Sequence, residues 1–268
     1  MTPRSTGVTF ASLGALGPAA APKIATAAEE LGFNAFWVAE ANGTESFALL
    51  GAAGAAAPGL SLGTGVIPAQ IRTPSLAAMG AATLQALHPA NEVLLGVGIS
   101  SPVVAGMWHG ADYGDRPIAQ MREYLTLMRE LLSGERVTFE GDFWAVKNFQ
   151  LGIRLDRQPK LILAALNAQM LRLGGELADG VLLNYLPANH VKQSIAEIHR
   201  GGNAEIYALV HAAVGEPEQQ LQRAQKDLFG YATVRGYANM FAAAGFSDEI
   251  AALKAARAER DRTASLAA

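Results

Sequence analysis

The side chains that could do chemistry in this sequence are few, and they follow apolar segments of strand length. Glu40, Ser100, Ser101 and His109 offer a carboxylate, two hydroxyl groups and an imidazole, which can bind a ligand or move a proton. They match no known catalytic motif, because these strand ends carry no HExxH, no Gly-x-Ser-x-Gly elbow and no paired carboxylates. As alternatives, Glu40 stabilises a helix N-terminus and His109 is simply an exposed loop residue.

The other histidines do not complete a metal site or a hydrolase. His88 and His199 fall at or near predicted helix ends, and His190 follows a predicted strand, so we expect no metal. Ser100 and Ser101 lack a histidine partner for a serine hydrolase. What remains is a glycine-rich, apolar set of strand ends, which is typical of a protein whose bound cofactor supplies the reactivity.

The composition favours a globular α/β protein. Half of the 268 residues are hydrophobic and 17% are charged; of one large domain or two small ones, we expect a single domain over 1–268. The net charge of −3, without a basic run, gives binding to nucleic acid or anionic membranes no electrostatic support. The sequence has no cysteine, which excludes disulfides and fits a cytoplasmic protein.

We expect no membrane-spanning segment. The most apolar window, residues 47–57, is too short and ends at Pro58. Residues 4–16 faintly resemble a signal peptide, but the short apolar run and its glycines favour a first strand instead.

The segment PKLILAALNAQMLRLGGELADGVLLNY, residues 159–185, predicts a strand, a turn, a helix and a second strand. Such a βαβ unit belongs to a parallel sheet with ligand sites at the carboxyl ends of its strands. The turn Ala165, Leu166, Asn167 and Ala168 brings backbone N–H groups to a helix N-terminus, which suits a phosphate. Any βα turn looks similar, so the turn alone does not establish a phosphate site.

The alternation of strands and helices continues along the chain. It predicts a TIM-type (β/α)8 barrel, either complete or incomplete, because a barrel normally closes with eight strands and only seven are evident. A flavodoxin-like open sheet is the alternative. Residues 217–268 contain only helical or polar sequence, and we expect their helices to cover the gap or the mouth of the site. The expected strands are 8–13, 33–38, 60–67, 93–97, 161–163, 181–183 and 206–211, with a hairpin over 137–140 and 143–146.

Several segments in this order resemble the luciferase-like monooxygenase superfamily, in particular its branch of coenzyme F420-dependent oxidoreductases. The resemblance covers roughly residues 7–200. The matching segments are LGFNAFWVAE (31–40), LGTGVIP (62–68), RTP (72–74), VLLGVG (93–98), the stretch 121–132, LSGERVTFEGDFW (132–144), LAALN (163–167) and ADG (178–180).

The resemblance implies a TIM-type barrel that binds a flavin or deazaflavin at the strand ends. In similar proteins the position of Glu40 lies near the cofactor ring, and the bond matching Gly65–Val66 is commonly a cis peptide. Relatives often carry a histidine where this chain has Ala41, and an acid or histidine at Ser101. With the residues at the strand ends, the expected cofactor-binding set is Glu40, Thr64, Gly65, Val66, Gly98, Ser100, Ser101, Ala165, Leu166, Asn167, Ala168 and Asn184. The expected catalytic set is Glu40, Ser101 and His109.

From the resemblance we expect an enzyme, an oxidoreductase that transfers hydride between F420 and a small organic substrate. The alternatives are an FMN-dependent monooxygenase of the same superfamily and a vestigial flavin-binding protein without activity. Relatives are commonly dimers, and the alanine-rich helix expected over residues 74–87 offers a flat face for a homodimer.

Overall fold

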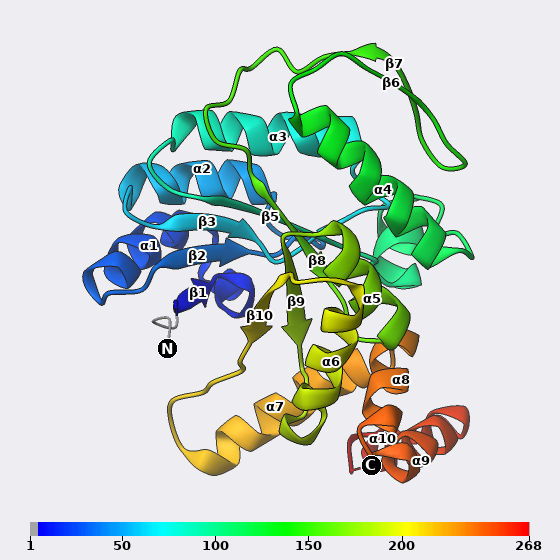
Figure 1. The fold of residues 1–268 in the computed structure, drawn as a ribbon. Helices are drawn as coiled ribbons and strands as arrows, with labels where there is room; N and C mark the ends of the chain where they lie inside the picture. The colour runs from blue at the N-terminus through cyan, green and yellow to red at the C-terminus, as the bar shows by residue number, and fades with distance from the viewer. Residues whose placement is uncertain (1–4, 268) are drawn as a thin grey trace.

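The computed structural model describes residues 5–267 of the chain. A parallel sheet curls through the molecule, and its strands lie in the order in which they occur in the sequence (Figure 1). The short β4 (Ile67–Pro68) follows β3 and pairs with β5. The other strands of this sheet are β1 (Gly7–Thr9), β2 (Ala35–Val38), β3 (Ser61–Thr64), β5 (Val93–Gly98), β8 (Lys160–Ala164), β9 (Gly180–Asn184) and β10 (Glu205–Leu209).

The sheet forms an open TIM-type barrel, which confirms the predicted fold class. β1 and β10 are its two ends, and within residues 5–267 no strand pairs with both of them. The ring of Tyr207 on β10 packs edge-on against Trp37 on β2, with ring centroids 5.7 Å apart. Side-chain packing therefore links β10 to β2, the neighbour of the other end strand, where strand pairing does not.

Helices follow the strands and pack on the outer face of the sheet (Figure 1). They are α1 (Ala21–Glu30), α2 (Ser46–Ala56), α3 (Pro74–Leu87), α4 (Pro117–Leu132), α5 (Ala168–Leu177) and α6 (Val191–Gly201). α3 has the predicted bounds, because the Thr73 hydroxyl accepts the Leu76 N–H at 3.3 Å and Pro74 occupies the first turn.

Four predicted strands are shorter than expected. The strands predicted over 33–38 and 206–211 are Ala35–Val38 and Glu205–Leu209. The strand predicted over 8–13 ends at Thr9, because the Leu13 N–H turns back to the Phe10 carbonyl and a 3-10 helix, η1 (Ala11–Leu16), begins. The strand predicted over 60–67 is divided into β3 and β4 at the cis peptide Gly65–Val66.

The hairpin forms, but its second strand, predicted over 143–146, begins later. The Glu123 carboxylate accepts the backbone N–H groups of Asp142, Phe143 and Trp144 at 2.8, 2.9 and 2.7 Å, so these residues form the turn. β6 (Val137–Glu140) therefore pairs with β7 (Ala145–Phe149).

A tryptophan fills the barrel interior. Trp37 packs with Leu94, Ile162 and Leu182 in a buried cluster inside the sheet. Gly63 on the neighbouring strand is required there, because a Cβ at this position would lie 2.3 Å from the Trp37 ring. The interior is thus a packed core, and a ligand has room only beyond the strand ends.

The tail consists of helices, as predicted, and it covers part of the mouth. α7 (Pro217–Ala232), α8 (Arg235–Ala243), α9 (Ser247–Ala258) and α10 (Arg262–Ala267) lie together below the ends of β9 and β10 in Figure 1. Phe241 and Ile250 pack against Leu166 and Leu186, which follow β8 and β9. Of the two positions expected for the tail, the mouth is therefore the one observed. Across residues 5–267, every helix is too short or too polar to cross a membrane.

Candidate functional site

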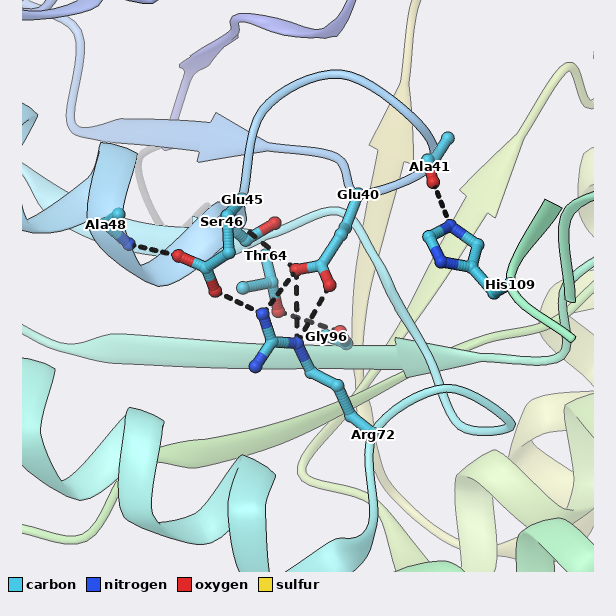
Figure 2. Close-up of polar contacts among 9 residues, drawn as sticks. All are labelled: Glu40, Ala41, Glu45, Ser46, Ala48, Thr64, Arg72, Gly96 and His109. Carbon is cyan, nitrogen blue, oxygen red and sulfur yellow. Dashed lines mark hydrogen bonds and ion pairs between the residues drawn. The ribbon is translucent and has the colours of Figure 1, made fainter. Parts of the chain in front are cut away.

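The Glu40 carboxylate is held in one orientation at the end of β2. Arg72 Nε donates to Glu40 Oε1 at 2.9 Å and to Oε2 at 3.2 Å, and Arg72 Nη2 donates to Oε2 at 3.1 Å (Figure 2). The Ser46 N–H adds a bond to Oε2 at 3.3 Å. The Glu40 and Arg72 side chains are only 12% and 13% exposed, so water weakens this pair less than it weakens a surface pair.

Arg72 also binds Glu45, which caps α2 by accepting the Ala48 N–H at 2.6 Å (Figure 2). The alternative role considered for Glu40, a helix N-terminal carboxylate, is thus filled mainly by Glu45. Burial works to lower the pKa of Arg72, but the hydrogen bonds and charges of Glu40 and Glu45 outweigh burial and raise it. Arg72 is therefore a permanent cation that fixes two carboxylates.

The end of β3 is tied to its neighbours by backbone bonds. The Gly65 N–H donates to the Val38 carbonyl at 2.7 Å, and the Glu40 N–H donates to the Val66 carbonyl at 3.1 Å. The Gly65–Val66 peptide is cis, as the resemblance implied. Thr64 is buried, and its hydroxyl donates to the Gly96 carbonyl at 2.7 Å (Figure 2). These bonds bring Glu40 and Val66 side by side at the mouth.

The residues after β5 contact a side-chain amide, Gln70 after β4, that the expected site set omitted. Gln70 Oε1 accepts the Ser100 N–H at 3.2 Å, while Gln70 Nε2 is buried and has no hydrogen-bond partner in the described chain. The Ser101 hydroxyl accepts the Val104 N–H at 3.2 Å, at the start of the π-helical segment η3 (Val103–Trp108). Gly98 is tightly placed, because a Cβ there would lie 3.1 Å from Val66 Cγ2.

His109 follows η3 and reaches back to the end of β2. Its Nε2 contacts the Ala41 carbonyl (Figure 2). A carbonyl oxygen only accepts hydrogen bonds, so Nε2 carries the hydrogen and Nδ1 keeps a lone pair when the ring is neutral. His109 is exposed, and the structure brings its imidazole to the residue next to Glu40.

The turn before α5 and the end of β9 contact the tail. Asn167 Nδ2 donates to the Gly236 carbonyl at 2.9 Å, and Asn184 Nδ2 donates to the Tyr237 hydroxyl at 2.8 Å. Ala168 is exposed, and α5 has no side-chain cap, so its first-turn N–H groups can still receive an anion. Asn184 Oδ1 also binds His211 Nε2 at 3.0 Å, a contact that the sequence analysis did not foresee.

The strand ends, the cis peptide and the held carboxylate belong to one recognisable architecture. The model of the luciferase-like monooxygenase family matches residues 5–268. This chain belongs to the luciferase-like monooxygenase family. This is the family that the sequence segments resemble, and the match extends into the tail helices.

Proteins similar to this luciferase-like chain include F420-dependent enzymes. It is 31% identical over 186 residues to an F420-dependent glucose-6-phosphate dehydrogenase of Nakamurella multipartita, covering 64% of this chain and 54% of that protein. It is 28% identical over 170 residues to a 5,10-methylenetetrahydromethanopterin reductase of Archaeoglobus fulgidus, covering 62% and 48%. The chain thus spans about half the length of these curated relatives.

The luciferase-like fold is also found in solved structures. The coenzyme F420-dependent tetrahydromethanopterin reductase of Methanopyrus kandleri matches with a TM-score of 0.79 and 18% sequence identity. The match covers 98% of this chain and 82% of that one. At this identity the likeness shows a shared fold.

Proposed function

We propose that this luciferase-like protein is an oxidoreductase that transfers hydride between coenzyme F420 and a small organic substrate. The observation that carries the proposal is the Glu40 carboxylate, fixed by Arg72 beside the Gly65–Val66 peptide at the mouth of the barrel. Similarity to F420-dependent enzymes, at 34% and 31% identity, supports the choice of cofactor.

The residues at the mouth fit a deazaflavin. The buried Gln70 Nε2 is a donor without a partner, and the carbonyl-rich edge of the ring system supplies acceptors for it. Val66 offers an apolar contact, and the Ser100 and Ser101 hydroxyl groups offer further polar ones. The first turn of α5, from Ala168, would receive the phosphate of the cofactor.

F420 supplies hydride transfer when it is bound, and the chain supplies position and a proton. Glu40 orients the ring, because Arg72 fixes the direction of its carboxylate. His109 Nδ1 takes the hydroxyl proton of an alcohol substrate during oxidation and returns a proton to the carbonyl oxygen during reduction.

The decisive experiment is titration of the purified protein with F420 and, separately, with FMN, followed by cofactor fluorescence. We expect saturable binding of F420 and much weaker binding of FMN. Gln70→Met removes the buried donor with little change in volume and should weaken F420 binding, whereas Gln222→Met, exposed on α7, should not. Tight FMN binding without F420 binding would replace this proposal with the FMN-dependent monooxygenase.

A further inference from the structure

A cavity of about 620 Å³ lies between the ends of β9 and β10 and the helices of the tail. Its volume is within the range of roughly 300–1,000 Å³ that is typical of small-molecule sites. Leu209 and His211 line it from the β10 side, and α7 to α10 line it from the other. Neither Glu40 nor the Gly65–Val66 peptide lines this cavity, so it is a second space beside the proposed cofactor site.

The cavity walls are mainly apolar. Phe229 and Leu228 come from α7, Phe241 comes from α8, and Ile250 comes from α9. Leu228 is 40% exposed and Phe246 39% exposed, although both line the cavity. Large apolar side chains left open to water around one concave surface indicate a site for an apolar ligand.

One end of the cavity carries a fixed pair of rings. His211 stacks on Tyr185, with ring centroids 3.7 Å apart and planes 21° from parallel. The Tyr185 hydroxyl donates to Asp227, and His211 Nε2 donates to Asn184 Oδ1 at 3.0 Å. Tyr185 has φ 51°, a left-handed conformation that is rare for a bulky residue and is often found at functional sites.

The pair of rings leaves one nitrogen for a ligand. His211 Nδ1 lies 3.9 Å from the nearer Asp227 oxygen, which is beyond hydrogen-bond distance. Nδ1 can therefore accept a hydrogen bond from a ligand hydroxyl when the ring is neutral, or donate one to a ligand carbonyl when it is protonated.

The charges around the cavity disfavour an anion. Among the described residues that line it there is no lysine or arginine, and Glu249 is the charged side chain. Asp227 adds a second negative charge behind His211. Phosphate and carboxylate groups are normally recognised by Arg or Lys, so a phosphorylated or carboxylated ligand has no counter-charge here.

The cavity adjoins the proposed cofactor site. Asn184, an expected cofactor contact, is hydrogen-bonded to His211 at the cavity end. Leu209 and Val66 both pack against the Trp37 cluster in the barrel interior. A ligand in the cavity therefore lies next to residues that face the mouth.

We propose that this cavity binds the substrate of the enzyme, and that the substrate is an uncharged, mostly apolar molecule with a hydroxyl or carbonyl group. The part of this inference that calls the ligand a substrate rests on the proposed function. The preference for a neutral apolar molecule rests on the cavity alone.

The test uses two probes with nearly the same aromatic skeleton. The full-length protein without cofactor is titrated with neutral N-phenyl-1-naphthylamine and with anionic 1-anilinonaphthalene-8-sulfonate, and fluorescence is measured. We expect the neutral probe to bind at one site and the anion to bind at least about tenfold more weakly. An apolar ketone such as 2-decanone should displace the neutral probe.

Two variants locate the binding in the cavity. Ala232→Trp fills the cavity and should abolish binding of the neutral probe, whereas Ala224→Trp, exposed on the same helix outside the cavity, should not. Phe246→Lys places a cation in the wall and should reverse the preference toward the anionic probe. This second variant keeps the test valid if Ala232→Trp does not fold. Equal affinity for both probes, unchanged by either cavity variant, would overturn the proposal.

A second measurement separates this inference from the proposed function. F420 binding and the F420-linked oxidation of an apolar secondary alcohol are measured in wild type and in Ala232→Trp. An unchanged F420 affinity with a raised KM for the alcohol supports the inference. Turnover with an unchanged KM contradicts it. Failure of F420 to bind, with the probe results as expected, overturns the proposed function and leaves the ligand site standing.

Discussion

Arg72 donates three hydrogen bonds to Glu40, from Nε at 2.9 and 3.2 Å and from Nη2 at 3.1 Å, although the two residues are 32 positions apart. The pair joins the end of β2 to the segment before α3. Both side chains are largely buried, so either residue without its partner would leave a poorly hydrated charge. The same contact thus supports the fold and orients the carboxylate at the proposed site.

The first prediction concerns this ion pair. Arg72→Met should lower the free energy of unfolding by about 2–4 kcal/mol, because it leaves the Glu40 carboxylate largely buried without a cation. Chemical denaturation measures the loss. Arg122→Met is the matched control, because Arg122 and Glu176 form an ion pair whose side chains are 48% and 46% exposed. That change should cost less than about 1 kcal/mol, and equal losses in the two variants would contradict the prediction.

The second prediction concerns the imidazole next to Glu40. His109→Ala should lower F420-linked turnover by about 10²-fold, the usual contribution of a positioned acid or base, without changing F420 affinity. Adding Ala41→His to this variant should restore part of the rate, because His109 already contacts the Ala41 carbonyl. His199→Ala, exposed on α6, is the control. A wild-type rate in His109→Ala would show that His109 is an exposed loop residue without a role in the reaction.

The local part of the fold could be predicted from the sequence. The cap Thr73 and the proline at position 74 fix the start of α3, and the continuous apolar run of β5 predicts a strand buried on both faces. The open barrel was also predictable, because the tail contains no apolar segment that could form an eighth strand. The cis Gly65–Val66 bond came from the family resemblance alone.

The long-range part of the site could not be predicted. Nothing near Glu40 in the sequence indicates Arg72 as its partner, and nothing near Asn184 indicates Tyr237 or His211. These contacts join residues that are 27 or more positions apart, so they depend on where the chain returns or on how the tail folds back. A signal was present in the tyrosines at 185, 231 and 237, but their spacing does not reveal that they meet.

The third prediction concerns the contact between the tail and the barrel. Asn167→Ala removes the bond to the Gly236 carbonyl and should lower the free energy of unfolding by about 0.5–1.5 kcal/mol, the usual net contribution of one hydrogen bond. Asn203→Ala, exposed before β10, is the control and should change stability little. Deleting the chain after Gly215 should cause aggregation, because it exposes the apolar residues that follow β8 and β9. A stable truncated protein with unchanged cofactor affinity would contradict a covering role.

The fourth prediction concerns pH. Burial lowers the pKa of His211 below its ordinary value of about 6.5, and the nearby Asp227 opposes this only in part. A lowered pKa in the folded state means that folding favours the neutral ring, so the stabilisation is present above about pH 6.5 and is lost as the pH falls below it. In thermal unfolding between about pH 7 and pH 5, His211→Gln should therefore lose less stability than wild type. A steeper loss of stability in the variant than in wild type would contradict this prediction.

The fifth prediction concerns self-association, which we propose occurs through α2 and α3. Leu76, Met79 and Leu87 on α3 are 49%, 50% and 65% exposed, and all three line a groove of about 380 Å³ between these helices. A second copy would remove this apolar surface from water. Light scattering at micromolar concentration should show a homodimer for wild type and a monomer for Met79→Glu. Leu221→Glu changes a residue that is 61% exposed on α7 and should leave the dimer intact. A wild-type monomer, or a dimer that survives Met79→Glu, would exclude this face.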